Sequence, residues 1–240
     1  MNGKTEMIEK PGNVKRLEFR DSRLNKMRSG EALTTLPFDD HPWVILHMIP
    51  TVPLESSEIE SQFNLHKLAP DMGKLPPELT LFRPIAPTDA DIGGEIKDGE
   101  LIIYARRRTL PTQGNSTGKS DEPEQDSAYS YLRIFRNGTV EAVRATYYST
   151  GKLLLPERFK GELLQAISRY LEILERLGVQ PPIAAILTIT GIKKGSPKET
   201  VTYFPEILIP SFEYRDQSKL TELMEETFNR IPINVIDRSY

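Results

Sequence analysis

The sequence has no cysteine and only three histidines, and these shortages exclude several kinds of site. Without cysteine there is no disulfide, thiolate metal site or cysteine nucleophile. The histidines, His41, His47 and His66, do not have the spacing of a zinc site. Catalysis, if present, would rest on Asp, Glu, Ser or Lys alone.

Long apolar runs are also missing. No stretch reaches the roughly 18 consecutive apolar residues that a membrane-spanning helix needs. Residues Met1 to Asn13 are polar and mixed in charge, unlike a secretory signal. We therefore expect a cytoplasmic protein that makes no membrane contact.

A strong positive charge is the third absence. The formal net charge is -3 at pH 7, which argues against a protein that coats nucleic acid through bulk charge. The hydrophobic fraction of 38% lies in the ordinary globular range. We expect a basic helix within residues 1–30 and a single α+β domain over residues 31–240.

The basic helix is predicted over Val14 to Arg28 and ends at Ser29-Gly30. Apolar residues recur near helical spacing at Val14, Leu17, Leu24 and Met27. The other face carries Lys15, Arg16, Arg20, Arg23, Lys26 and Arg28. Such a face is typical of a solvated surface, and it would also suit contact with phosphates.

An apolar run of strand length, Trp43 to Ile49, lies between Pro42 and Pro50. This pattern favours a central strand covered on both faces. Alternation places His47 on the face of Trp43 and Ile45. We expect a structural role for His47, as a neutral imidazole bonded to a backbone carbonyl, in preference to a ligand or acid–base role.

Two dipeptides predict tight turns. Asp98-Gly99 should open a strand over Glu100 to Arg106. Asn137-Gly138 should join strands Tyr129–Arg136 and Thr139–Tyr147 through a type I′ turn, which needs positive φ at both central residues. In that register the residues sharing one face are Tyr131, Arg133, Phe135, Val140 and Arg144.

Pro156 should begin a long packing helix that runs to Leu177 and ends at Gly178. The elements expected after it are a buried strand Ile183–Thr190, a strand near Val201–Ile209 and a helix near Gln217–Arg230. Together these predict an α+β fold. Its mainly antiparallel sheet would be packed by the long helix on one face, with the N- and C-terminal helices at the margins.

The middle of the chain is less regular. A helical turn near Ser56–Asn64 and a short strand at Leu79–Phe82 are expected. Residues 109–127 should form a flexible loop, because few apolar groups offset its ordering entropy. Within it, Gly118-Lys119-Ser120 matches the last three residues of the phosphate-binding loop motif, but Gln113 occupies the position where that motif needs its first glycine. We expect no nucleotide and no other cofactor.

Arginines near aromatic residues give a nucleic-acid hypothesis, because such groups stack on and neutralise single strands. The candidate residues are Arg16, Arg20, Arg23, Arg106, Arg107, Arg108, Arg133 and Arg144. The same pattern arises where arginines simply pack over tyrosines at a half-exposed surface.

The carboxylates are scattered over predicted loops, such as Asp39-Asp40 and residues 121–126, and the strand interiors are nearly free of them. A two-metal site or acid–base pair needs acids projected from rigid elements toward one point. A metal-dependent hydrolase or nuclease is therefore the least favoured function. We expect no catalytic residue and no bound metal.

The order of several segments resembles a known bacterial arrangement. These segments are Arg20-Asp21-Ser22-Arg23-Leu24-Asn25, Val44–Pro50, Tyr131–Gly138, Tyr170–Val179 and Pro181-Pro182 with its following strand. They resemble the C-terminal half of bacterial proteins whose N-terminal half is a Schlafen AlbA-type DNA-binding domain, also described as divergent ATP-binding proteins. The nucleic-acid or nucleotide chemistry of that family is attributed to the N-terminal domain, which has no counterpart here, so the resemblance implies no catalytic residue.

These observations favour a noncatalytic binding or regulatory module. The resemblance implies a role accessory to a nucleic-acid-associated, AlbA/Schlafen-like protein. Contact would be with a protein partner or with a second copy of the chain. Direct nucleic-acid binding by the basic helix and the Arg/aromatic sheet face is the alternative.

Overall fold

The computed structural model describes residues 11–32, 43–54, 90–107, 128–145, 156–192 and 199–229. The helical turn expected near Ser56–Asn64, the strand at Leu79–Phe82 and the loop at 109–127 lie outside these ranges. Among the described helices, none is both long enough and apolar enough to cross a membrane.

In the described part of the chain, eight strands form one sheet in which neighbouring strands pair antiparallel, so the α+β class is confirmed. The strands are β1 Trp43–Pro50, β2 Ala90–Lys97, β3 Glu100–Arg107, β4 Ala128–Ile134, β5 Val140–Ala145, β6 Ile183–Ile192, β7 Glu199–Tyr203 and β8 Ile207–Ile209. Their order is β2-β3-β4-β5-β1-β6-β7, and β8 pairs with β6. The helices within the described ranges are α1 Pro11–Arg28, α4 Pro156–Arg176, the 3₁₀ helix η2 Phe212–Arg215 and α5 Gln217–Asn229.

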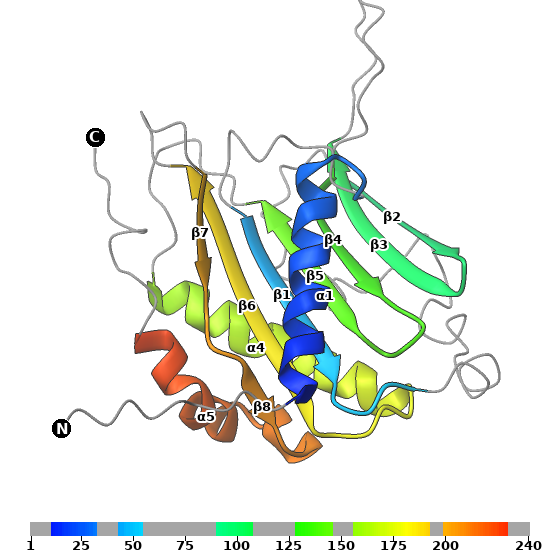
Figure 1. Cartoon of the computed structure of the whole chain (residues 1–240). Coiled ribbons are helices and arrows are strands. Elements are labelled where there is room, and N and C mark those ends of the chain that lie inside the picture. The colour runs from blue at the N-terminus through cyan, green and yellow to red at the C-terminus, as the bar shows by residue number, and fades with distance from the viewer. Residues whose placement is uncertain are drawn as a thin grey trace, which may run out of the picture.

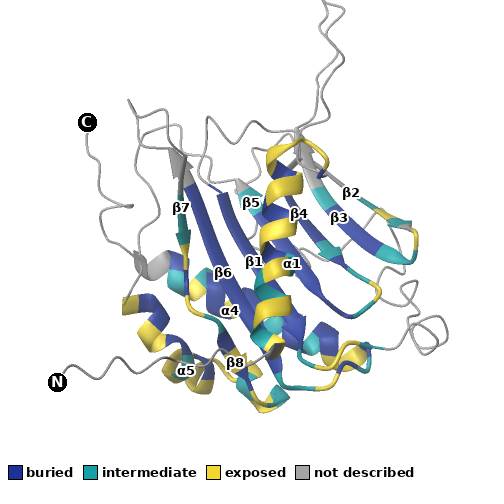
Figure 2. Cartoon of the chain, viewed as in Figure 1, coloured by how far each residue is buried: buried dark blue, intermediate teal, exposed yellow. Residues whose placement is uncertain are grey.

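The strand β1 lies inside the sheet between β5 and β6, as its apolar run predicts. All of its residues are buried, because helices cover both faces of the sheet at this point (Figures 1 and 2). Residues Val44, Leu46 and Met48 face the larger core. Trp43 and Ile45 face a smaller core on the other side.

The larger core lies between the sheet and α4. The residues Leu163, Ile167, Tyr170 and Leu174 recur on one side of α4 and are each 0% exposed. Full burial of each of the three aliphatic side chains, Leu163, Ile167 and Leu174, contributes roughly 1.5–3 kcal/mol. The helix ends as predicted, because Gly178 adopts a φ of 77° and Val179 N donates to Leu174 O at 3.0 Å.

The helix α1 differs from the expected arrangement, because it does not lie at the margin of the sheet. It crosses the middle of the face opposite α4 (Figure 1). Its residues Leu24 and Met27 form the smaller core with Trp43, Tyr131 and Val143. Residues 1–30 therefore include an element on which burial of the sheet depends.

The β4–β5 hairpin also differs from prediction, in its turn and its register. Phe135 N donates to Thr139 O at 2.8 Å, so three residues form the loop. Gly138 has a φ of 79°, whereas Asn137 is not in the positive-φ region. This geometry is that of a turn followed by a glycine bulge, in place of the type I′ turn. A type I′ turn occurs at Asp98-Gly99, where φ is 52° and 71°.

The altered register moves side chains between faces, because neighbouring strand residues alternate. Tyr131 is opposite Val143, and Arg133 is opposite Glu141. Arg144 instead faces α4, where its Nη1 donates to Glu162 Oε2 at 3.2 Å. The prediction that Arg144 shares a face with Tyr131 and Arg133 is therefore wrong.

The C-terminal elements largely match their predictions. The expected strand Val201–Ile209 is two strands, β7 and β8, joined through Phe204, Pro205 and Glu206. Proline cannot donate a ladder hydrogen bond, which accounts for the break. The helix α5 packs beside α4 (Figure 1).

Candidate functional site

Four polar side chains meet between α1 and the sheet, and we call them the Glu141 cluster. They are Arg23 from α1, His47 from β1, Tyr131 from β4 and Glu141 from β5. Each is buried, and the exposed fractions are 0% for both His47 and Glu141. The cluster therefore depends on four separate elements coming together.

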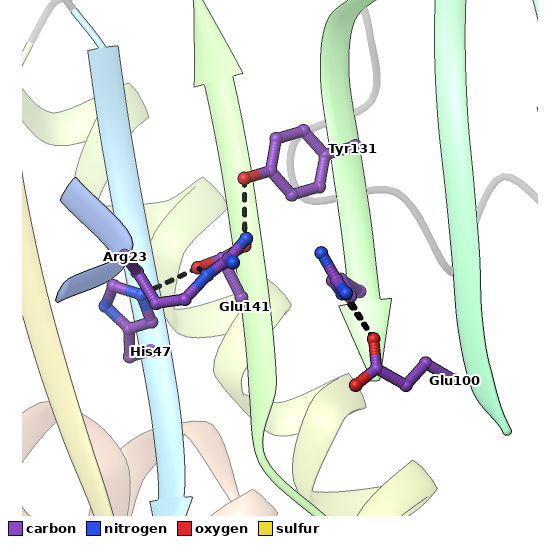
Figure 3. A network of polar contacts seen from close by, with 6 residues as sticks. Arg23, His47, Glu100, Tyr131 and Glu141 are labelled. Atoms are coloured by element: carbon purple, nitrogen blue, oxygen red, sulfur yellow. Dashed lines mark hydrogen bonds and ion pairs between the residues drawn. The ribbon is translucent and has the colours of Figure 1, made fainter. Parts of the chain in front are cut away.

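Glu141 is the shared acceptor of the cluster (Figure 3). Arg23 donates from Nε to Oε2 and from Nη2 to Oε1, each at 2.7 Å. Tyr131 donates its hydroxyl to Oε1 at 2.9 Å, and His47 Nε2 lies 3.1 Å from Oε2. Both carboxylate oxygens are thus hydrogen-bonded twice, as a buried carboxylate requires.

The charges of the cluster stabilise one another. Burial alone would raise the pKa of Glu141, but hydrogen bonds from Arg23 and His47, with their charges, outweigh it and lower the pKa to about 2. Burial acts on the pKa of Arg23 in the lowering direction, and the bonds and charge of Glu141 outweigh that and raise it. Burial, followed by the charge of Glu141, raises the pKa of Tyr131 well above its usual value. Glu141 is therefore held ionised beside a protonated Arg23.

His47 contacts a different group from the one predicted. It bonds to a carboxylate through Nε2, rather than to a backbone carbonyl. Its Nδ1 is buried and has no hydrogen-bond partner in the part of the chain that is described. Phe19 of α1 lies edge-on to the imidazole, with ring centroids 5.7 Å apart. The side chain thus packs under α1 on the predicted face.

A carboxylate, a histidine and a tyrosine in contact are groups used in acid–base catalysis. Here all three side chains are buried beneath α1, and both oxygens of Glu141 are already hydrogen-bonded. Within the described ranges, no group of three or more His, Asp or Glu residues could hold a metal ion. The arrangement is that of a buried ion-pair network joining α1 to the sheet.

Three candidate arginines of α1 face the sheet rather than solvent. Arg16 donates to Glu206 from Nε at 2.9 Å and from Nη2 at 2.6 Å. Arg23 is committed to Glu141. Arg20 is 9% exposed, and its guanidinium lies 4.2 Å from the ring centroid of Tyr203.

Of the remaining candidate arginines, the two whose side chains are described, Arg133 and Arg144, lie on opposite faces of the sheet. Arg133 pairs with Glu100 on the α1 face, and Arg144 pairs with Glu162 on the α4 face. Arg106 and Arg107 belong to β3, but only their backbone is described. Arg108 lies outside the described residues. The nucleic-acid role of these residues stays a prediction.

A pocket lies between the N-terminal half of α1 and the β7–β8 connection. Its volume is about 560 Å³. Asn13, Leu17 and Arg20 line it from α1. The opposite wall runs from Thr202 to Glu206. It is an open site in which a buried guanidinium meets the end of the described sheet.

Sequence reasoning missed Glu141 and the pocket. A signal for Glu141 was present, since it is the one acid within the apolar stretch Val140 to Val143. The predicted register put it on the wrong face, away from Tyr131. No local signal pairs Arg16 with Glu206, because 190 positions separate them.

The chain was compared with protein-family models, with curated proteins and with solved structures. None of these comparisons found a match. The Schlafen AlbA-type resemblance therefore remains a hypothesis.

Proposed function

We propose that this chain is a noncatalytic binding module that docks an extended segment of a partner protein beside β7. The observation that carries the proposal is the surface formed by β7, β8 and the N-terminal half of α1. This surface, the β7 edge, combines an end strand, the open pocket and half-exposed apolar side chains. Each of these features supports binding of a peptide segment.

The strand β7 is the last strand on its side of the described sheet. One side of it pairs with β6, and no described strand pairs with the other. Backbone N–H and C=O groups on such an edge can accept an added strand. Its sequence of Thr200, Val201 and Thr202 suits extended pairing, because β-branched residues favour strands.

Apolar side chains gather at the same surface. Large hydrophobic side chains exposed in the described part are Val14, Val52, Tyr203 and Leu208. Of these, Tyr203 is 48% exposed on β7 and Leu208 is 45% exposed on β8. An apolar segment laid beside β7 would cover side chains that otherwise contact water.

The Glu141 cluster supports the noncatalytic part of the proposal. Its carboxylate is already bonded to three side chains and is closed to solvent. An acid–base residue has to reach the proton that it transfers. The bonds of Glu141 instead favour a role in holding α1 on the sheet.

The proposed partner is a nucleic-acid-associated protein with an AlbA-type domain, and its support is the segment order described above. The module would be accessory to such a protein and would act in the cytoplasm, a location favoured by the polar, mixed-charge composition of Met1 to Asn13.

Site-specific photo-crosslinking tests the proposal. A benzophenone amino acid placed at Tyr203 or Leu208 should capture the same protein in the native host. The same group at Arg176, which is exposed on α4, should not capture it. The captured protein is identified by mass spectrometry, purified and tested for slowed amide hydrogen exchange in β7.

Equal capture from Arg176, or unchanged exchange in β7, would contradict docking beside this strand. Capture of a second copy from Tyr203, together with a dimer in light scattering, would replace the partner with self-association. A captured protein without an AlbA-type domain would retain the docking mode and reject the proposed partner.

A further inference from the structure

The pocket between α1 and β7 contains Arg20, whose ion pairing differs from that of Arg16 and Arg23. Arg16, Arg20 and Arg23 follow one another along the sheet-facing side of α1. Arg16 bonds to both oxygens of Glu206 in the β7–β8 connection, and Arg23 bonds to both oxygens of Glu141 on β5. Arg20 has no such carboxylate among the described residues.

The one carboxylate at Arg20 belongs to the adjacent residue of its own helix. Nε and Nη2 both contact Oδ1 of Asp21, at 2.8 Å. The side chain of Asp21 is 51% exposed, so solvent weakens this interaction. This contact uses the Nε–H group and one of the two hydrogens of Nη2. The end-on edge of the guanidinium, formed by Nη1 and the other hydrogen of Nη2, has no described acceptor.

The orientation of Arg20 is fixed before any ligand arrives. Its guanidinium stacks on the ring of Tyr203 at 4.2 Å from the centroid, and the Arg20 side chain is only 11% exposed. A buried guanidinium that lacks a two-oxygen acceptor is costly, since water has been removed from it. A planar carboxylate at the free edge would replace that water with two parallel hydrogen bonds.

The remaining residues of the pocket indicate which chemical group would lie next to the bound carboxylate. Leu17, Phe204 and Pro205 provide apolar wall. The charges of Arg16 and Arg20 are balanced by those of Glu206 and Asp21. This balance favours a single negative charge on an apolar body over a multiply charged phosphate.

We infer that the pocket binds the C-terminal carboxylate of the docked segment, which accepts hydrogen bonds from the end-on edge of Arg20, while the apolar wall holds the last side chain. This inference rests on the proposed docking beside β7. It adds that the segment is the extreme C-terminus of the partner and that its last residue is apolar.

The test uses N-acetylphenylalanine, which carries a carboxylate on an apolar body, and its primary amide. Both are titrated into the full chain while the backbone amide signals of residues 202–204 are followed by NMR. The free acid should shift these signals with an affinity at least about tenfold higher than the amide, because only the acid forms charge-assisted bonds. Acetate and inorganic phosphate at the same concentrations should bind more weakly than the free acid.

Variants then assign the effect to Arg20. Arg20→Gln should reduce affinity for the acid to that for the amide. Arg176→Gln removes the same charge on the α4 side and should leave the affinity unchanged within about twofold. Because Arg20 is buried, Tyr203→Leu serves as a second variant. It removes the stacking at a half-exposed position and should weaken acid binding several-fold while the thermal transition is retained.

Equal binding of acid and amide, or acid binding that survives both substitutions, would overturn the carboxylate site. If cross-linking at Tyr203 still succeeded, docking beside β7 would be supported without a carboxylate site. Acid binding through Arg20 with no cross-linked partner would show a site for free carboxylates and overturn the chain-terminus assignment. Phosphate binding as tight as the acid would overturn the apolar specificity.

Discussion

At the scale of single residues, the Glu141 carboxylate accepts four side-chain hydrogen bonds in the described structure. A carboxylate with 0% exposure is stable only if its oxygens are paired, and here Arg23, His47 and Tyr131 supply the bonds. Removal of Arg23 alone leaves the charge of Glu141 buried without its main partner. Removal of both charges of the Arg23–Glu141 pair leaves no unpaired charge, but it also removes the interaction.

A double-mutant cycle measures this dependence. We expect Arg23→Met alone to lower the free energy of unfolding by about 3–5 kcal/mol, since Glu141 then stays buried without its main partner. The pair Arg23→Met with Glu141→Gln should cost clearly less than the sum of the single changes. Urea unfolding followed by Trp43 fluorescence provides the measurement. Strict additivity would contradict a direct pair.

The low pKa of Glu141 predicts a pH dependence of stability. The pKa is about 2 in the folded chain against an ordinary 4.5, so the unfolded state binds the proton more readily. Its contribution is therefore present above pH 4.5 and is lost as pH falls toward 2. Between pH 6 and pH 3 the free energy of unfolding should fall by about 2 kcal/mol through this group.

Comparison with Glu141→Gln isolates that part of the pH dependence. The variant lacks the titrating carboxyl, so its stability should fall less steeply between the same two pH values. Other acids titrate alike in both proteins and cancel in the difference. Parallel pH profiles for the two proteins would place the stabilising acid elsewhere.

At the scale of elements, the turn at residues 136–138 decides which side of β5 faces α1. A three-residue loop with a bulge puts Glu141 on the face of Tyr131, whereas a two-residue loop would put it on the other face. Gly138 makes this turn possible because it adopts a φ of 79° without a side chain. The bulge therefore determines whether the Glu141 cluster forms.

Alanine substitutions at two glycines test the importance of that turn. A Cβ at Gly138 would lie 2.7 Å from Val179 Cγ2, while a Cβ at Gly30 would meet nothing within 4 Å. Both glycines have positive φ, so both variants share the backbone penalty. The free energy of unfolding of Gly138→Ala should therefore be lower than that of Gly30→Ala by about 1–3 kcal/mol, because of steric overlap. Thermal or urea unfolding measures the difference, and equal losses would show that the contact with Val179 relaxes freely.

At the scale of the whole molecule, the net charge of -3 is combined with arginines that are already paired. Arg16, Arg23, Arg133 and Arg144 bond to carboxylates from other elements. Their charges are thus largely neutralised within the protein. This distribution favours a protein partner over bulk attraction to nucleic acid.

Gel-shift measurements test that expectation. At about 50 mM salt we expect no shift of labelled single- or double-stranded oligonucleotides at micromolar protein, because few described cations are free to replace counterions. A shift that weakens steeply with salt would instead support the nucleic-acid hypothesis. Charge reversal at the exposed Lys15 and Lys26 would then be the informative change, since reversal at Arg23 would disrupt the Glu141 cluster.

Much of the fold could be predicted because its signals are local. Pro156 and Gly178 mark the ends of α4, and Trp43 to Ile49 reads as a buried strand from its own composition. The candidate site could not be predicted in the same way. Its ion pairs join residues 118 positions apart in one case and 190 in another. No periodicity or motif encodes such a pairing.

The sequence by itself determined where most of the described helices and strands form, since caps, turn residues and apolar periodicity act over a few positions. It did not predict β2, and it predicted β7 and β8 as one strand. It also determined that thiol chemistry is excluded. Only the tertiary structure decided that α1 lies across the sheet and that Glu141 turns inward to meet Arg23. It also decided that Arg20, unlike Arg16 and Arg23, has no two-oxygen partner among the described residues. The physical reason is that strand register and helix docking are set by packing between distant segments, and a one-residue change in register reverses which charges are buried.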